Sequence, residues 1–285
     1  MKKGTTLVEL LTSVGIITVL LGLLLSAVQA VRGSAEYVEH MSWLRQRRLD
    51  DQPHRKNLRV VFIGNSRLYY YDTPGIVVQF AKTIGTHIDA KVIVEGGQSL
   101  MGHWEQGLAQ NAIESRWNDF VVLQEKGDAQ YYDPETYHEY VTKFTKLCKN
   151  DAAVLLMVNW YVPSDFRYID RLTSEVVSAI KNPDNKGSEI LASGEAFRSA
   201  MTERPDINLF LDDGHPNEIG AYYSACFFHS VMHRVSPVGL PNEICTNDGV
   251  NIFIDPEVAL FLQKKSWEIA QKFRAKYKPY YLSHK

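Results

Sequence analysis

Short apolar runs alternate with stretches of helical periodicity along the part of the chain that follows residue 57. The runs are rich in β-branched residues and have largely apolar interiors, as strands covered on both faces do. We expect strands at Leu58–Ile63, Lys91–Glu95, Asp119–Gln124, Ala153–Asn159 and Glu189–Ser193. Apolar residues at helical spacing predict helices between them, at Pro74–Ile84, Gly102–Ser115, Pro134–Lys149 and Ser164–Lys181. This order predicts an α/β domain with a five-stranded parallel sheet in a flavodoxin-like, three-layer α/β/α arrangement.

An almost uncharged stretch from Leu10 to Val31 precedes this domain. Its twenty-two residues are enough to cross a hydrocarbon layer of about 30 Å, so the sequence predicts a transmembrane helix. Lys2 and Lys3 lie before the stretch, and the positive-inside rule then places everything after Val31 outside the cytoplasm. We therefore expect a single-pass membrane protein with its main domain extracytoplasmic.

The residues at the start of this stretch resemble a bacterial prepilin leader. In that family cleavage follows a glycine and a glutamate is fifth in the mature chain, and Gly4 and Glu9 have this spacing. Thr5 departs from the family, which usually has phenylalanine there. The resemblance implies a bacterial cytoplasmic membrane, processing by a prepilin peptidase and a partner for Glu9 within the bilayer. Two alternatives stay open, namely cleavage by signal peptidase after Val28-Gln29-Ala30 and an uncleaved anchor.

Four parts follow from these patterns: the leader and transmembrane helix at 1–31, a charged spacer at 32–57, the α/β domain at 58–240 and a C-terminal helical extension at 241–285. Asp255-Pro256-Glu257 is typical of a helix start. Apolar residues then recur at helical spacing, at Val258, Phe261, Leu262, Ile269 and Phe273. We expect this last helix to pack onto the α/β domain.

Charge and cysteine content exclude several classes of partner. The formal net charge is −2, and apart from a short stretch at Arg45–Arg48 no basic run is interleaved with aromatic residues, so we expect no nucleic-acid binding. Cys148, Cys226 and Cys245 are widely spaced and form neither a CxxC pair nor a zinc pattern. We expect no metal and no cofactor, while one disulfide with one free thiol stays open.

Two polar blocks lie where loops of such a sheet are expected to carry chemistry, at the carboxyl ends of the strands. Ser66 directly follows the first strand, in Ile63-Gly64-Asn65-Ser66. A serine hydroxyl is a weak nucleophile until a base takes its proton, and the base needs an orienting carboxylate. The block Leu211-Asp212-Asp213-Gly214-His215 supplies both groups, just before a helical segment at Gly220–His229.

Together these blocks resemble the SGNH (GDSL-like) serine hydrolase superfamily, which has Gly-x-Ser after strand one, a glycine-bearing loop after strand two and Asp-x-x-His near its end. The resemblance covers roughly two-thirds of the chain and is closest to a branch of unassigned function. It implies that Ser66 is the nucleophile, that His215 is the base and that Asp212 orients the imidazole. Asp213 is the alternative for the last role, although we expect it to be a turn residue or a loop acceptor.

An acyl-transfer site also needs donors for the developing oxyanion. The resemblance implies the backbone N–H of Ser66, the backbone N–H of Gly97 and a side-chain amide after strand three. The wider family has an asparagine within Gly-x-Asn-Asp at the third position, and this sequence lacks it. Gln124 is our substitute because a primary amide donates where a carboxylate does not, although a loop-filling role for Gln124 is equally open.

Other residues near the expected strand ends are candidates for a substrate pocket. They are Tyr69 in the run Tyr69-Tyr70-Tyr71, Trp104, Glu125 as support for the serine site, and Trp160. The bulk of the tyrosine run favours a narrow site. Glu95 and Glu125 as a glycosidase pair would leave the Asp-x-x-His block unexplained, and the segment Gly194–Phe197 is expected to be a structural loop.

The sequence therefore predicts a membrane-tethered, extracytoplasmic serine esterase that removes O-acetyl or similar small acyl groups from carbohydrate through an acyl-serine intermediate. Hydrolysis of lipid esters or of thioesters is the less favoured activity. An alternative of another class is a catalytically silent SGNH-fold module for binding or assembly in a pilus-like or secretion system. The missing asparagine donor favours that alternative.

Overall fold

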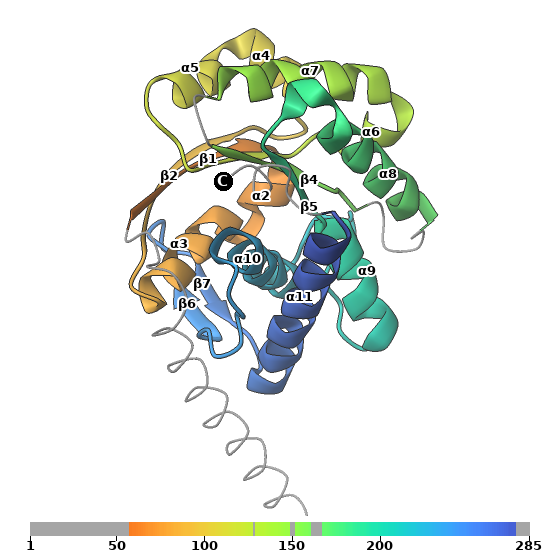
Figure 1. Ribbon diagram of the computed structural model, residues 1–285. Helices are drawn as coiled ribbons and strands as arrows, with labels where there is room; N and C mark the ends of the chain where they lie inside the picture. The colour runs from red at the N-terminus through yellow and green to blue at the C-terminus, as the bar shows by residue number, and fades with distance from the viewer. Residues whose placement is uncertain (1–56, 128, 149–151, 161–166, 278–285) are drawn as a thin grey trace, which may run out of the picture. The chain divides into compact units, whose positions relative to one another are not determined.

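The computed structural model describes residues 57–277, except 128, 149–151 and 161–166 (Figure 1). Its centre is a five-stranded parallel sheet in the order β2-β1-β3-β4-β5. The strands are β1 (Asn57–Gly64), β2 (His87–Val94), β3 (Phe120–Leu123), β4 (Ala153–Met157) and β5 (Ser188–Leu191). The apolar residues of β1, β3 and β4 are almost completely buried because helices cover both faces of the sheet.

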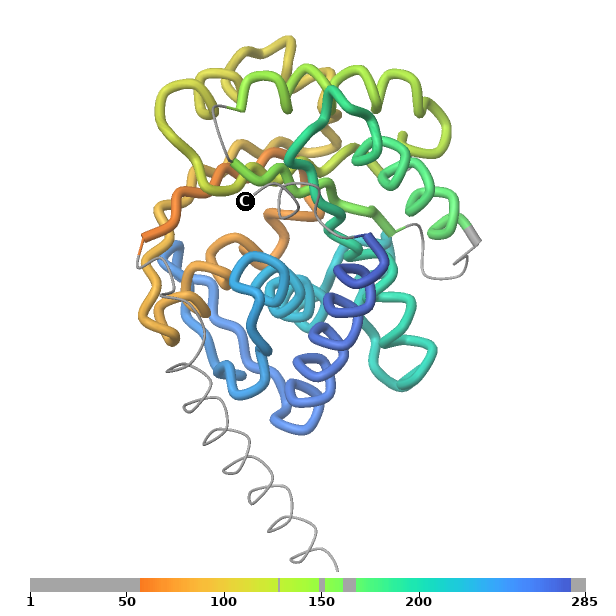
Figure 2. Tube along the Cα trace, in the orientation of Figure 1, coloured from red at the N-terminus to blue at the C-terminus, as the bar shows by residue number. Residues whose placement is uncertain are grey.

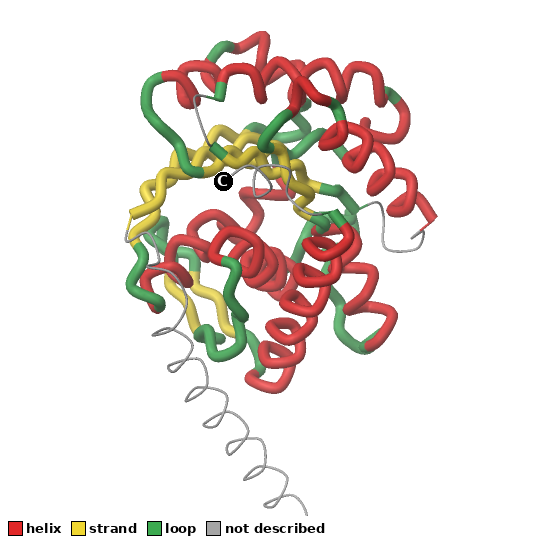
Figure 3. Tube along the Cα trace, viewed as in Figure 1, coloured by secondary structure: helices red, strands yellow, loops and turns green. Residues whose placement is uncertain are grey.

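Helices form a layer on each face of the sheet (Figures 1 and 3). One layer holds α4 (Leu100–Gln106), α5 (Leu108–Glu114), α6 (Ala129–Tyr132), α7 (Pro134–Leu147) and α8 (Arg167–Lys181). The other holds α2 (Ser66–Tyr69), α3 (Thr73–Thr83), α9 (Ser193–Glu203), α10 (Glu218–His233) and α11 (Pro256–Lys276). Two 3-10 helices, η1 (Tyr70–Asp72) and η2 (Pro183–Asn185), complete the helical part. The three-layer α/β arrangement predicted from the alternating pattern is confirmed.

The last helix belongs to the same core as the sheet. Leu262, Ile269 and Phe273 of α11 are buried in the cluster that contains the strands and α10. Gln263 of α11 is also buried, and its amide donates to the Tyr222 hydroxyl at 2.6 Å and to the Leu240 carbonyl at 2.9 Å. The trace in Figure 2 shows α11 running beside α9 and α10. Folding of the α/β part and of this helix is therefore coupled.

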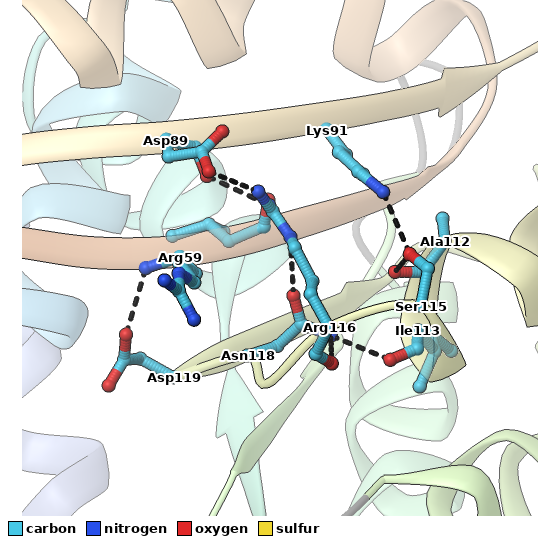
Figure 4. Close-up of polar contacts among 10 residues, drawn as sticks. Arg59, Asp89, Lys91, Ala112, Ile113, Ser115, Arg116, Asn118 and Asp119 are labelled. Atoms are coloured by element: carbon cyan, nitrogen blue, oxygen red, sulfur yellow. Dashed lines mark hydrogen bonds and ion pairs between the residues drawn. The ribbon is translucent and has the colours of Figure 1, made fainter.

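A polar cluster fixes the sheet toward the amino ends of its strands, away from the loops that carry the candidate site (Figure 4). The Arg116 guanidinium pairs with the Asp89 carboxylate and donates to the carbonyls of Val60 at 3.2 Å and Asp89 at 2.9 Å. Asn118 accepts from the same guanidinium at 3.0 Å, and Asp119 accepts from the Arg59 N–H at 2.8 Å. These bonds join β1, β2 and the approach to β3.

Several boundaries differ from the sequence prediction. The helix expected at Gly102–Ser115 is two helices, because Gly107 has a φ of +79° that ends α4 and begins α5. The expected loop at Gly194–Phe197 is the first part of α9. A hairpin of β6 (Glu243–Cys245) and β7 (Asn251–Phe253) lies in the expected helical extension. Cys148, Cys226 and Cys245 are all free, so the disulfide left open by the sequence is not formed between them.

Candidate active site

Ser66 lies at the start of α2, just past the carboxyl end of β1, the strand between β2 and β3. Gly64 lets the Gln124 side chain pack against this turn, because a Cβ there would lie 2.4 Å from the Gln124 Oε1 atom. Asn65 caps α2 by accepting from the Arg67 N–H at 3.2 Å, and its amide donates to the Gln98 carbonyl at 2.9 Å. The Asn65 side chain thus joins the turn that carries Ser66 to the loop after β2.

His215 reaches Ser66 across the carboxyl edge of the sheet. The Nε2 atom of the imidazole lies 2.7 Å from the Ser66 Oγ atom, although the two residues are 149 positions apart. Ser66 is only 8% exposed, so its hydroxyl is largely shielded from solvent. This contact is the geometry that a serine nucleophile and its base require.

The carboxylate beside the imidazole belongs to Asp213. Its Oδ2 atom lies 2.8 Å from His215 Nδ1, and its Oδ1 atom accepts from the His215 backbone N–H at 3.1 Å. The second bond is an Asx turn, which fixes the carboxylate next to its own histidine. The carboxylate is off the direction of the Nδ1–H bond, so the ring contact is a close polar contact rather than a hydrogen bond.

The prediction that Asp212 orients His215 is corrected by this contact. Asp212 is exposed, and the structure records no hydrogen bond or ion pair between its carboxylate and the imidazole. The reason lies in the turn, where Gly214 has a φ of +81° and its N–H donates to the Leu211 carbonyl at 3.0 Å. That backbone conformation brings the side chain two positions before the histidine, not three, against the ring.

Two backbone N–H groups in the loops after β1 and β2 have no acceptor among the described residues. Neither the N–H of Ser66 nor that of Gly97 donates a hydrogen bond to any residue that the structure describes. Gly97 has a φ of +66°, a conformation that L side chains rarely adopt, so the loop depends on glycine there. The predicted pair of backbone oxyanion donors therefore remains compatible with the geometry.

Comparison with solved structures places this geometry in a known architecture. A protein from Slackia heliotrinireducens, provisionally described as an SGNH hydrolase, superposes with a TM-score of 0.53 at 20% identity, covering 62% of this chain and 99% of that one. A lipase/acylhydrolase from Enterococcus faecalis gives 0.48 at 18% identity, covering 63% and 98%. An acetyl xylan esterase also gives 0.48 at 18% identity, covering 59% and 96%. The domain has the SGNH hydrolase fold. No family model and no curated protein matches the sequence.

In this SGNH fold the amide of Gln124 is not available as the third oxyanion donor. Gln124 is fully buried, and its Nε2 atom donates to the Glu125 carbonyl and to Asn159 Oδ1, the latter at 3.4 Å. Its Oε1 atom accepts from the Asn65 N–H at 2.7 Å. The prediction of Gln124 as a donor is therefore corrected to the loop-holding alternative. Gln124 thereby holds the turn at Asn65 that carries Ser66.

Asn159 and His103 are buried polar residues that the sequence did not single out as support. The Asn159 amide donates to the carbonyls of Glu125 at 2.7 Å and Gly127 at 3.1 Å. The His103 Nε2 atom lies 2.7 Å from the Gly64 carbonyl, and burial lowers the pKa of this imidazole. The neutral ring donates to Gly64, which ends β1 immediately before the nucleophile turn. A polar residue just past a buried strand was the only sequence signal for Asn159.

The two predicted pocket tryptophans pack against other aromatic side chains. Trp104 packs edge-on against Tyr140 and Phe144 and therefore joins α4 to α7. Trp160 is fully buried, is stacked on Phe197 at 4.4 Å, and donates its indole N–H to the Gly214 carbonyl at 3.1 Å. Trp160 thus holds the loop that carries His215. Of the other two pocket candidates, Tyr69 is 41% exposed and Glu125 is 2% exposed, so only Tyr69 is accessible from solvent.

Glu125 is a buried carboxyl beneath the site. Its Oε1 atom accepts from the N–H of Lys126 at 2.6 Å and from that of Leu100 at 3.3 Å. Burial raises the pKa of this carboxyl from 4.5 to about 7, against the lowering effect of the two backbone donors. Glu125 therefore ties the loop after β3 to the first residue of α4.

Stability of the wild-type protein is expected to fall as the pH rises from about 5 to 8, because the folded state binds a proton at Glu125 that the unfolded state loses near pH 4.5. Glu125→Gln keeps Oε1 as acceptor and removes this proton. The loss attributable to Glu125 is on the order of 3 kcal/mol at the upper end. Urea unfolding of both proteins across this range checks it. Glu189, whose pKa burial also raises to about 7, is present in both, so the difference between the two curves isolates Glu125.

The leader residues lie outside the described part of the chain. Gly4, Glu9 and the stretch Leu10–Val31 belong to residues whose structure is not described. Among the helices that are described, none is long and apolar enough to span a bilayer. The described residues also contain no group of three or more His, Cys, Asp or Glu side chains placed to hold a metal ion.

Proposed function

We propose that this protein is a serine esterase of SGNH type that works through an acyl-serine intermediate. The single observation that carries the proposal is the 2.7 Å contact between Ser66 Oγ and His215 Nε2. Ser66 Oγ attacks the ester carbonyl carbon while His215 Nε2 takes the hydroxyl proton. The oxyanion accepts hydrogen bonds from the backbone N–H groups of Ser66 and Gly97, and Asp213 stabilises the imidazolium that forms.

Collapse of the tetrahedral intermediate breaks the bond between the carbonyl carbon and the alcohol oxygen. His215 Nε2 returns the proton to that oxygen, and the alcohol leaves. A water molecule then attacks the acyl-serine carbonyl with His215 again accepting a proton, and the second collapse releases the carboxylic acid and restores the Ser66 hydroxyl. Every proton passes through the same imidazole, so no further titrating group is required.

For the substrate we propose small acyl groups, such as O-acetyl, on carbohydrate. Support comes from aromatic bulk close to the oxyanion loop, since the Tyr69 hydroxyl lies 3.3 Å from where a Cβ at Gly96 would be. Such crowding favours a short acyl chain. Acetate release from an acetylated oligosaccharide, compared with fatty-acid release from a long-chain ester, tests this choice. Faster hydrolysis of the long-chain ester would contradict it.

We also propose that the protein is tethered to a bacterial cytoplasmic membrane by its N-terminal segment, with the esterase domain extracytoplasmic. The support is the apolar sequence from Leu10 to Val31 behind Lys2 and Lys3. Processing by a prepilin peptidase rests on the spacing of Gly4 and Glu9. Mass spectrometry of the mature amino terminus tests it, because this peptidase leaves Thr5 first whereas signal peptidase leaves Val31 first.

A catalytically silent binding or assembly module is the second candidate. It is favoured by the commitment of the Gln124 amide to internal bonds, which leaves the site with two oxyanion donors instead of three. A silent module would not need an activated serine. The two candidates therefore differ in the reactivity of one hydroxyl.

Fluorophosphonate labelling of the full-length protein separates these candidates. The reagent phosphonylates serines activated by a neighbouring base, so we expect one label per chain on the peptide that contains Ser66, located by mass spectrometry. Ser188, which is buried at the amino end of β5, serves as an internal control and should stay unlabelled. Absence of label on Ser66, together with no hydrolysis of p-nitrophenyl acetate, would favour the silent module.

A further inference from the structure

The Asp213 carboxylate holds the catalytic imidazole only weakly. Its side chain is 58% exposed, and the carboxylate lies off the line of the His215 Nδ1–H bond. Water therefore screens this contact, and no hydrogen bond to Nδ1 fixes the orientation of the ring. Proton transfer nevertheless requires Nε2 to stay within hydrogen-bond reach of Ser66 Oγ. Another group must restrict the ring.

Tyr70 covers one face of that ring. The centroids of the Tyr70 and His215 rings are 4.4 Å apart and their planes are 9° from parallel. Tyr69 supports Tyr70 from behind, at 5.5 Å and 26°. A parallel stack at this distance opposes rotation of the imidazole, because turning it would drive its edge into the phenol ring. The π face of Tyr70 also stabilises the imidazolium more than the neutral ring.

The backbone directly after Tyr70 is strained. Tyr71 has φ 52° and ψ 23°, and Asp72 has φ 52° and ψ 55°, so two consecutive residues other than glycine adopt the left-handed conformation. Such residues are disfavoured and persist where the surrounding structure holds them. Asp72 is held by capping α3, since its Oδ1 atom accepts from the Gly75 N–H at 2.9 Å. This turn lets the chain reverse between α2 and α3 while Tyr70 stays over His215.

We propose that Tyr70 is a positioning residue that orients His215 for proton transfer, sharing with Asp213 the role that the aspartate has alone in many serine hydrolases. The proposal rests on the esterase function proposed above. It assigns a role to the strain at residues 71 and 72, which keeps the phenol ring in the stack. The stack involves only the ring of Tyr70, so the ring without its hydroxyl should suffice to orient His215.

The test measures p-nitrophenyl acetate hydrolysis by the full-length protein and its variants. Tyr70→Phe keeps the ring and is expected to retain kcat within about 2-fold, whereas Tyr70→Leu removes the π face and is expected to lower kcat about 10-fold with KM little changed. Tyr70→Met is a second apolar replacement in case the leucine variant does not fold. Trp117→Leu removes an exposed aromatic residue just before β3, at the opposite edge of the sheet, and should leave kcat unchanged.

A double variant distinguishes positioning from a merely structural role. If Tyr70 acts through His215, Tyr70→Leu has no further effect on the residual activity of His215→Ala. An equal fold-loss in the two backgrounds, or an unchanged kcat for Tyr70→Leu in a wild type that labels at Ser66, would overturn the role of Tyr70 and leave the esterase intact. A wild type that neither labels nor hydrolyses ester removes the proposed function, and this role with it.

Discussion

Replacing His215 with alanine is expected to lower kcat for p-nitrophenyl acetate by roughly 10⁴-fold to 10⁶-fold, with a small change in KM. In the proposed mechanism the imidazole takes the Ser66 proton, and its Nε2 atom is 2.7 Å from the hydroxyl oxygen. Without it the hydroxyl attacks as a neutral alcohol. Steady-state kinetics of the full-length variant give the measurement, after circular dichroism shows that it is folded.

Two companion variants show whether the loss comes from the proposed machinery. Ser66→Ala combined with His215→Ala should be no slower than either single variant, because the two groups act as one unit. His138→Ala is the matched control, since this histidine lies on α7 and pairs with Glu175 at 3.1 Å, outside the site. A similar loss for His138→Ala, or a His215→Ala enzyme with near wild-type kcat, would contradict the assignment.

Asp213→Ala is expected to lower kcat by about 10-fold to 100-fold, and Asp212→Ala by less than about 3-fold. Contacts with the backbone N–H and the side chain of His215 lower the pKa of the Asp213 carboxyl, so it stays ionised. In the proposed mechanism this charge stabilises the imidazolium. The expected loss is smaller than for a buried triad aspartate because the Asp213 side chain is 58% exposed. Kinetics at several salt concentrations check this reason, since screening should weaken the contribution of an exposed pair.

The adjacent aspartates make the comparison well matched, because both variants remove one carboxylate from the same turn. Asp213→Asn adds a finer step, since it keeps an oxygen to accept from the His215 N–H while losing the charge. A larger loss for Asp212→Ala than for Asp213→Ala would reverse the assignment and restore the spacing that the sequence favoured.

The strands were predictable because burial on both faces of the sheet requires short runs of apolar residues in the sequence. Apart from the exposed Arg59, the interiors of β1, β3 and β4 consist of apolar, mostly β-branched or leucine residues, and each observed strand overlaps the predicted one. The start of β2 was less predictable, because this edge strand begins at His87 and includes exposed positions such as Val92, which is 42% exposed. The break at Gly107 was also missed, since a glycine within a helical pattern does not reveal its φ.

Within the site, the sequence identified Ser66 and His215 but not the atoms around them. Trp160 illustrates the limit, because an aromatic residue after a strand end is equally consistent with a pocket wall and with core packing. The structure decides for packing, with the indole fully buried against Phe197 and bonded to Gly214. Gln124 is a similar case, since composition shows that an amide is present but not what it donates to.

The sequence by itself determined the α/β order, a serine at the end of the first strand and a histidine in an acidic turn near the end of the domain. These features follow from local periodicity and from short spacings along the chain. Only the tertiary structure decided that Asp213 and not Asp212 faces the imidazole, that the Gln124 amide is committed internally and that Tyr70 covers the ring. Each depends on how a turn is bent or on contacts between segments far apart in the chain, and a one-dimensional pattern carries neither backbone dihedrals nor long-range packing.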